Sequence, residues 1–235
     1  METTARFFQV DHPAHVERVH AAAARAIPGY GGEGFSGAEY QRDKQARLAD
    51  LFAGQGRTPD AVTIVAATDE RAADVLGAVV VETPYYDEFA TTDPDRARAL
   101  ARSHRTLAAL FVDDAHRGTG LGRRLLIEFA AYNLTLNAGA RYLDGFVDDR
   151  AGSVDFYRSV GAVVTGHNAG LPARRPTNTP MNHTPQVNGH WFYLDAWPLF
   201  EGPMLLCSRC QNQLAFDPRD GGDLVCATCG PPPGQ

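Results

Sequence analysis

Four cysteines near the C-terminal end of the chain have the spacing of a metal site. Cys207 and Cys210 form one C-x₂-C pair, and Cys226 and Cys229 form a second pair after fifteen intervening residues. Each C-x₂-C turn can place two thiolates on one side of a metal, and two turns complete a tetrahedron. The first 200 residues contain no cysteine, whereas a disulfide framework would spread its cysteines over the fold. The spacing therefore predicts Zn²⁺ held in a reducing, cytoplasmic compartment.

The segment around these cysteines resembles a zinc ribbon. Residues 214–216 and 224–225, between the two pairs, are predicted to form two short strands. A tail of about 30 residues is too small to build a core of its own, so the metal would have a structural role. Recruitment of a protein partner is the alternative. The segment is not basic, which makes nucleic acid an improbable partner.

A glycine turn is the second chemical signal. Residues 117–122 read Arg-Gly-Thr-Gly-Leu-Gly and join an apolar strand predicted at 107–112 to an amphipathic helix predicted at about 120–136. Glycines let a ligand approach the backbone closely, and a helix start offers unpaired N–H groups and a positive dipole end. The turn therefore predicts a pyrophosphate site, to which Arg117, Arg123 and Arg124 could add charge. A glycine-rich turn that binds nothing is the alternative.

Two common nucleotide motifs do not fit this turn. A P-loop is excluded because no Gly-Lys-Ser/Thr follows. A dinucleotide-binding fingerprint needs Gly-x-Gly-x-x-Gly after a first strand. Here Gly118, Gly120 and Gly122 lie in mid-chain, after several predicted strands and helices.

Residues 107–161 resemble the acetyl-CoA-binding core of the GNAT superfamily of N-acetyltransferases. The family's Arg/Gln-x-x-Gly-x-Gly/Ala is met by Arg117, Gly120 and Gly122, and its Leu-aromatic-Val strand end by residues 110–112. Its Phe/Leu-Tyr-x-x-x-Gly element is met by residues 156–161, Phe-Tyr-Arg-Ser-Val-Gly. Two positions depart from the pattern. Arg150 replaces an Asn that many members have seven residues before the Tyr, and Asp114 replaces a common Pro.

The resemblance implies direct transfer of an acetyl group from acetyl-CoA to a primary amine of a small molecule or a protein. It implies a GNAT-like α/β domain over residues 1–200, followed by the zinc-ribbon-like tail at 201–235. Dimers are common among proteins resembling this family, so a homodimer is possible. The residues expected to bind the cofactor are Phe111, Val112, Arg117, Gly118, Thr119, Gly120, Leu121, Gly122 and Arg123.

The resemblance also suggests catalytic roles. The backbone amide of Val112, or one near it, would polarise the thioester carbonyl, and the Tyr157 phenol would protonate the leaving sulfur. Glu82, at the end of a predicted strand facing the cleft, is the first choice for the base. Asp113, Asp87 or a relayed water are the alternatives.

A non-catalytic protein is the competing hypothesis. Such a protein would use the acyl-CoA pocket as a sensor or scaffold and dock a partner through its zinc ribbon. The intact Tyr157 and the glycine turn favour the enzyme, whereas Arg150 in place of Asn favours the alternative.

The predicted elements form a mixed α/β domain with a partly antiparallel sheet flanked by helices. Strands are expected at 6–10, 61–67, 75–82, 107–112, 142–147, 162–165 and 191–194, and helices at 13–26, 38–53, 92–104, 120–136 and 151–159. The polar turn at 69–73 predicts that the strands on either side are antiparallel neighbours. Residues 166–190 are predicted to form a long loop.

Composition narrows the class of protein. The net charge is −6, which argues against a general nucleic-acid binder. No stretch approaches the roughly 18 apolar residues of a membrane span, and the first residues do not resemble a secretory signal. Lys44 is the only lysine among the 22 Lys and Arg residues, a bias that suggests a GC-rich bacterial genome.

Overall fold

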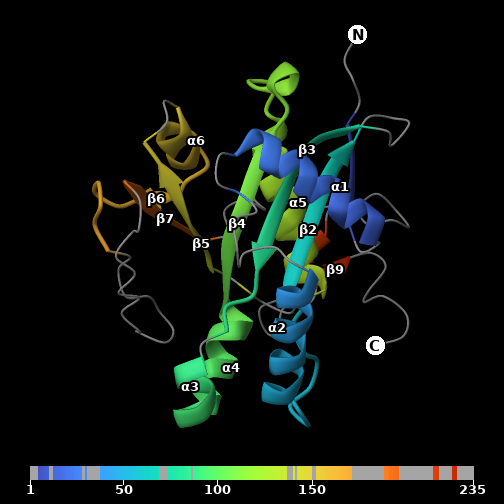
Figure 1. The fold of residues 1–235 in the computed structure, drawn as a ribbon, viewed down its shortest axis with the longest axis vertical. Helices are drawn as coiled ribbons and strands as arrows, with labels where there is room; N and C mark the ends of the chain where they lie inside the picture. Colours follow the sequence, from blue (N-terminus) through green and yellow to red (C-terminus); the bar gives the residue numbers. More distant parts are fainter. Residues whose placement is uncertain are drawn as a thin grey trace.

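A seven-stranded mixed sheet forms the centre of the fold (Figure 1). Its strands lie in the order β1-β2-β3-β4-β5-β7-β6, and a separate hairpin pairs β8 with β9. Neighbouring strands are antiparallel except β4 and β5, which are parallel. The computed structural model describes residues 5–10, 13–27, 30, 38–68, 74–85, 87–136, 140, 142–149, 152–170, 188–195, 214–216 and 224–226.

The strands are β1 (Arg6–Gln9), β2 (Val62–Thr68), β3 (Val75–Glu82), β4 (His104–Val112), β5 (Tyr142–Asp148), β6 (Val163–Val164), β7 (Gly189–Asp195), β8 (Leu214–Phe216) and β9 (Leu224–Cys226). The helices are α1 (Pro13–Ala26), α2 (Ala38–Leu51), α3 (Asp87–Thr92), α4 (Pro94–Ser103), α5 (Leu121–Leu136) and α6 (Ser153–Ser159), with a 3₁₀ turn η1 at Asp114–His116. Within the described part of the chain, no helix has the length and apolarity needed to cross a membrane.

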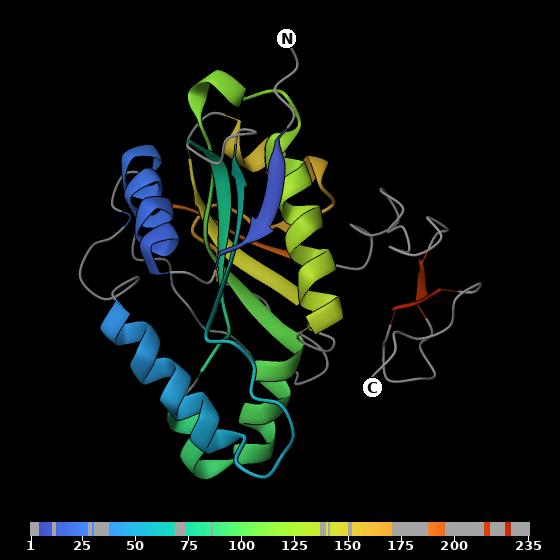
Figure 2. The same cartoon turned by 90° about the vertical axis from the view of Figure 1, so that its right-hand side faces the viewer.

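Helices cover both faces of the sheet (Figure 2). Val79 and Val81 of β3 belong to an apolar cluster that includes side chains of α5 and α6. Ala78 and Val80, which alternate with them, belong to a second cluster that includes side chains of α1. Since side chains alternate along a strand, Glu82 at the end of β3 points to the face that α1 and α2 cover.

The structure confirms the predicted order of elements and changes some boundaries. The helix expected at 92–104 is α4 at Pro94–Ser103, the short helix α3 before it was not predicted, and β4 begins at His104 rather than at residue 107. Asp93 caps α4, because its side chain accepts a hydrogen bond from the Arg96 N–H at 3.1 Å. Ala97, Leu100 and Ala101 of α4 are buried.

The strands predicted within the tail form the β8–β9 hairpin, in which Leu214 pairs with Cys226. Cys207, Cys210, Cys229 and the side chain of Cys226 lie outside the described residues. The same is true of residues 171–187 of the predicted long loop. The division of the chain near residue 200 therefore stays a prediction.

Candidate active site

The two parallel strands at the centre of the sheet separate part-way along their length. The pairs between β4 and β5 run from His104–Tyr142 to Leu107–Gly145. Ala108 is an extra residue in β4, because Val80 pairs with Ala109 while Val81 pairs with Leu107. Such a bulge bends its strand and increases the local twist. Among the described residues, β4 beyond this point pairs only with β3, which leaves a gap between β4 and β5.

Backbone N–H groups of β4 point into this gap. The Asp113 N–H donates to the Leu76 carbonyl on the β3 side at 2.8 Å. Successive N–H groups of a strand point to opposite edges, so the N–H groups of Val112 and Leu110 point towards the β5 side. The Val112 carbonyl points to the same edge as its N–H, and it accepts a hydrogen bond from Arg117 Nε at 3.4 Å. The amide predicted to polarise a carbonyl is therefore directed into the gap.

The glycine turn follows β4 and leads into α5. Gly118 and Gly120 have φ angles of +77° and +85°, a backbone region that residues other than glycine rarely adopt. A Cβ at either glycine would meet no atom within 4 Å, so the backbone here faces open space. Gly122 has a different role, because a Cβ there would lie 3.3 Å from Phe156 of α6. Its small size lets the start of α5 pack against α6.

The turn and the start of α5 contain three arginines. Arg117 is exposed and forms an ion pair with Asp114 at 2.8 Å, and Arg123 is exposed at the start of α5. Arg124 is instead engaged along its helix, where it binds Glu128 at 2.6 Å and lies over the Phe7 ring of β1. All three arginines are exposed near the helix start, and the ion pairs of Arg117 and Arg124 lie on the surface.

Tyr157 lies on the face of the sheet that α5 and α6 cover. Its side chain is 8% exposed and its ring stacks on Phe192 of β7, with centroids 3.9 Å apart. Burial, and then the negative charge of Asp148, raises the pKa of its phenol well above the usual value. Tyr157 therefore keeps its proton at any physiological pH, as a general acid must before it donates.

Glu82 lies on the opposite face and is paired with the only lysine. The Lys44 Nζ of α2 is 2.6 Å from Glu82 Oε2, and the two side chains are 9% and 8% exposed. Burial and the charge of Glu82 raise the pKa of Tyr40, and the same two causes raise the pKa of Tyr30 to about 12. Glu82 is thus a buried anion among one cation and two protonated phenols.

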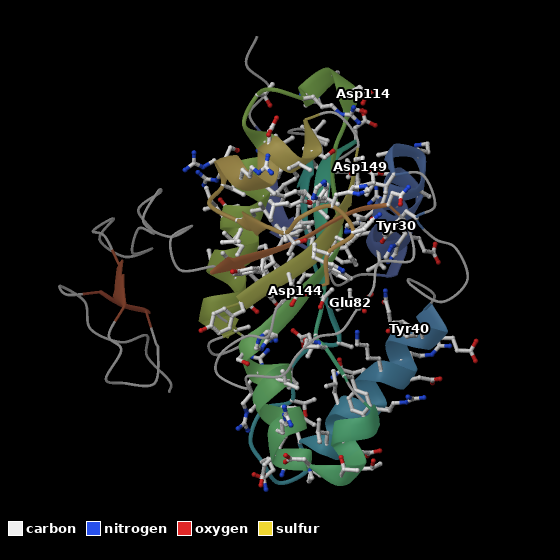
Figure 3. The ribbon with its side chains drawn as sticks, turned by 90° about the vertical axis from the view of Figure 1, so that its left-hand side faces the viewer. Tyr30, Tyr40, Glu82, Asp114, Asp144 and Asp149 are labelled. Carbon is white, nitrogen blue, oxygen red and sulfur yellow. The ribbon has the colours of Figure 1, made fainter. Side chains whose placement is uncertain are left out.

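The structure adds a second buried carboxylate that the sequence reasoning missed. Asp144 of β5 is 2% exposed and accepts a hydrogen bond from Thr106 Oγ1 at 3.0 Å. Glu82 pairs with Thr106, and Thr106 pairs with Asp144, so the three residues form one row across β3, β4 and β5 (Figure 3). An aspartate inside an otherwise apolar strand was the only sequence signal for this residue.

Asp113 and Asp87 were the alternative candidates for the base. Asp113 is exposed and accepts a hydrogen bond from the Ala115 N–H at 3.0 Å, which caps η1. It therefore has a local structural role on the turn. Asp87 begins α3, and its side chain lies outside the described residues.

The two predicted catalytic side chains lie on opposite faces of the sheet. Tyr157 belongs to the cluster around α5, and Glu82 contacts α2. A sheet normally separates such groups. The gap between β4 and β5 is the place where both faces can act on one bound molecule.

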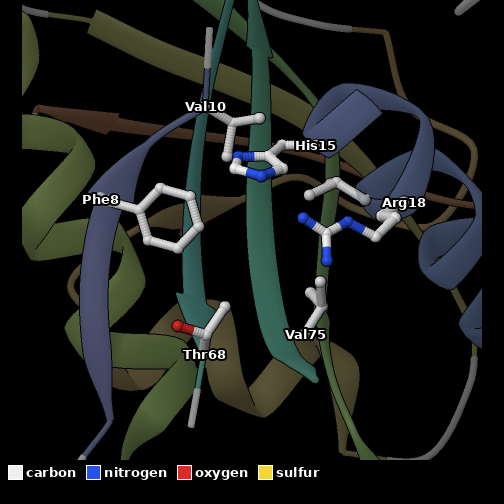
Figure 4. A pocket seen from close by; sticks show the side chains of 7 residues that line it. Phe8, Val10, His15, Arg18, Thr68 and Val75 are labelled. Atoms are coloured by element: carbon white, nitrogen blue, oxygen red, sulfur yellow. The ribbon is translucent and has the colours of Figure 1, made fainter. Parts of the chain in front are cut away.

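Two hollows of the described structure lie near these elements. One, of about 160 Å³, is lined by Tyr40, Asp43, Lys44, Arg47 and Tyr85 and lies beside the Lys44–Glu82 pair. The other, of about 20 Å³, lies between Phe8, His15 and Arg18 and has room for about one water (Figure 4). Residues of the glycine turn line neither hollow.

The sequence of residues 32–162 matches the model of the acetyltransferase (GNAT) family. The chain belongs to this family. It is accordingly an N-acetyltransferase that uses acetyl-CoA, and the non-catalytic sensor is not favoured. No curated protein matches the chain in sequence.

Solved structures with a similar fold are distant in sequence. The ribosomal-protein-S18-alanine N-acetyltransferase from Escherichia coli is 13% identical, with a TM-score of 0.47 over 82% of this chain and 94% of that one. An aminoglycoside 6'-N-acetyltransferase complexed with coenzyme A is 14% identical, with a TM-score of 0.49 over 81% and 97%. Arabidopsis thaliana NAA60 with a bisubstrate analogue is 13% identical, with a TM-score of 0.48 over 82% and 98%.

No metal site is found within the described residues, where no group of three or more His, Cys, Asp or Glu side chains could hold an ion. The four predicted zinc ligands are not among these side chains, because their side chains lie outside the described residues. The zinc ribbon therefore stays a prediction from the cysteine spacing.

Proposed function

We propose that the acceptor of the acetyl group is a primary amine, on a small molecule or a protein, that reaches the gap from the α1/α2 face. The row of Glu82, Thr106 and Asp144 carries this proposal. It places the negative charge of buried carboxylates at the base of the gap, where Glu82 already pairs with the Lys44 ammonium. A protonated amine complements that charge, because buried charges need partners.

Acetyl-CoA binds from the other face in this proposal. The amides of residues 117–122 and the side chains of Arg117 and Arg123 hold the pyrophosphate, supported by the open turn and the start of α5. The N–H of Val112 or Leu110 then donates to the thioester oxygen as the carbonyl carbon becomes tetrahedral. One such donor can contribute ~3 kcal/mol to the transition state.

Proton transfers complete the reaction. Glu82 or Asp144, directly or through a water, accepts a proton from the acceptor ammonium, and the free amine attacks the carbonyl carbon. The carbon–sulfur bond breaks, and Tyr157 gives its proton to the leaving thiolate. The nitrogen loses its second proton as the amide forms, and that proton, directly or through solvent, restores the Tyr157 phenol.

The tail holds a structural Zn²⁺ in this proposal. Cys207, Cys210, Cys226 and Cys229 would supply four thiolates, the donor set that structural zinc prefers. The β8–β9 hairpin fits this proposal, because β9 ends at Cys226, the first cysteine of the second pair. We propose the boundary between the catalytic domain, 1–200, and this tail, 201–235, on the same basis. A homodimer and a cytoplasmic location stay predictions from the sequence.

The decisive experiment measures free thiol released from acetyl-CoA in the presence of a panel of small amines, peptides and proteins. At least one amine is expected to drive thiol release in the native protein. The Tyr157→Phe variant should bind acetyl-CoA and lose most of this release. Acetyl-CoA binding without transfer to any amine would contradict the proposed activity.

A further inference from the structure

Lys44, the one lysine of the chain, forms an ion pair with Glu82, the candidate base. Its side chain leaves α2, is 9% exposed, and places Nζ 2.6 Å from Glu82 Oε2. The Lys44 ammonium also lies 5.5 Å from the centre of the Tyr40 ring. A primary ammonium on this carboxylate is what the proposed function expects of a bound acceptor.

The surroundings of Lys44 fit a bound alkylamine. Glu82 pairs in register with Thr106, and Thr106 pairs with Asp144. This row lies one residue before the last β4–β5 pair, Leu107–Gly145. The hollow of about 160 Å³ beside Lys44 is walled by Tyr40 and Tyr85. It is similar in size to an engineered cavity of ~150 Å³ that holds benzene. A lysine side chain is flexible, so this space lets Lys44 change its position without unfolding α2.

We propose that Lys44 is a site of self-acetylation. The inference rests on the proposed function. Glu82 accepts a proton from the Lys44 ammonium, and the neutral amine attacks the carbonyl carbon of acetyl-CoA bound to the same chain. An N–C bond forms, the C–S bond breaks, and coenzyme A leaves as the thiol after Tyr157 protonates it. The nitrogen loses its second proton as the amide forms, and that proton restores the Tyr157 phenol. The products are Nε-acetyl-Lys44 and free coenzyme A, with the first proton from Lys44 released to solvent from Glu82.

Self-acetylation has an electrostatic consequence. An acetylated lysine has no charge and cannot pair with a carboxylate. Glu82 then becomes a buried anion without its cation, and it is available to an external protonated amine. Lys44 is thus an internal acceptor that occupies the site until it is modified or displaced.

The test incubates the full chain with acetyl-CoA and no added amine. The intact mass should increase by one acetyl group, and peptide mapping should place that group on Lys44 rather than on the N-terminal amine. The fractional rate should be independent of protein concentration, because the reaction is intramolecular, and an added acceptor amine should slow it. Lys44→Arg is the matched control, since it keeps the cation beside Glu82 and should gain no acetyl group there.

Tyr157→Phe separates catalysis from spontaneous chemical acetylation. Removal of a general acid costs about 10²–10⁴-fold in rate, so Lys44 acetylation should slow by at least about tenfold in this variant. An equal rate in Tyr157→Phe, or a rate that rises with protein concentration, would overturn the inference. So would an unmodified Lys44 in a protein that acetylates an added amine, and that outcome leaves the proposed function intact. A protein that modifies neither Lys44 nor any added amine contradicts both.

Discussion

Thr106 and Asp144 are the last cross-strand pair on the α1/α2 face before β4 and β5 separate, and the Thr106 hydroxyl donates to the Asp144 carboxylate at 3.0 Å. The next pair, Leu107 and Gly145, faces α5, since Leu107 belongs to the cluster on that side. A buried carboxylate therefore lies at the base of the gap on the side from which an amine would enter.

Replacing Asp144 by Asn should lower kcat/KM for an amine acceptor, because the amide can neither accept a proton nor attract an ammonium. If Asp144 is the base, the loss should be about 10²–10⁴-fold. Steady-state thiol release, compared with Glu82→Gln, would show which of the two carboxylates has that role. Asp95→Asn is the control, since the Asp95 side chain is 91% exposed on α4 and should leave the rate unchanged. A fully active Asp144→Asn enzyme would remove this residue from the site.

The pH dependence of activity should reflect the raised pKa of Tyr157. Its raised pKa means that the phenol loses its proton only above the usual tyrosine range, so Tyr157 causes no loss of activity between pH 8 and about 10. Tyr157→Phe should lower kcat by about 10²–10⁴-fold and leave the alkaline side of the profile unchanged in shape. Binding of acetyl-CoA, measured by calorimetry, should be retained. An alkaline decline centred at or below about pH 10 that disappears in the variant would mean that the pKa of the phenol is not raised.

Local chemistry was predictable from the sequence. The glycines at 118 and 120 indicated a tight turn before a helix, and both have positive φ angles there. The polar turn after residue 68 indicated an antiparallel pair, which β2 and β3 form. These features depend on residues close together in the chain, so their spacing carries enough information.

The acceptor side of the site was not predictable in the same way. The row of Glu82, Thr106 and Asp144 depends on the register of three strands, and that register depends on the bulge at Ala108. The contact between Lys44 and Glu82 joins residues 38 positions apart. Neither a bulge nor a long-range ion pair has a signature in hydrophobic periodicity, which explains why Lys44 and Asp144 were missed.

Breaking the Lys44–Glu82 ion pair should lower the free energy of unfolding, whereas replacing both residues by apolar ones should change it little. Lys44→Met leaves a buried carboxylate without its cation, so the free energy of unfolding should fall by about 3–5 kcal/mol. The double variant Lys44→Met, Glu82→Met should recover most of this loss, because no buried charge remains. Urea denaturation measures both. Arg158→Ala, which breaks an exposed ion pair with Asp155, should cost less than about 1 kcal/mol. Equal losses in the single and double variants would contradict this account.

Gly145 should tolerate no side chain. A Cβ there would lie 2.6 Å from Phe192 Cζ and 3.1 Å from Leu107 Cβ. Gly145→Ala should therefore destabilise the protein by about 1–3 kcal/mol through overpacking. Because Phe192 also stacks on Tyr157, the variant should lose activity as well. Gly170→Ala is the control, since a Cβ there meets nothing within 4 Å and should change stability by less than about 0.5 kcal/mol. A stable, active Gly145→Ala enzyme would mean that Phe192 moves freely.

Zinc removal should affect the tail and spare acetyl transfer. Four thiolates at this spacing should bind one Zn²⁺ per chain, and a zinc-bound tail too small for its own core should unfold when the metal leaves. Treatment with a chelator at mildly acidic pH is expected to release one equivalent of zinc and to make residues 201–235 sensitive to protease. Thiol release from acetyl-CoA should continue, because the proposed catalytic side chains Tyr157, Glu82 and Asp144 all precede the tail.

Cys226→Ser is the matched variant for this prediction. It removes one thiolate from the proposed set, so zinc content, measured by a colorimetric chelator after denaturation, should fall well below one equivalent per chain. Ser208→Ala, a change between the first two cysteines that removes no thiolate, should keep its zinc. If the native chain contains no zinc while its four thiols react freely, the tail is not a zinc ribbon. If zinc removal abolishes transfer by the intact catalytic domain, the tail contributes to the active site rather than folding independently of it.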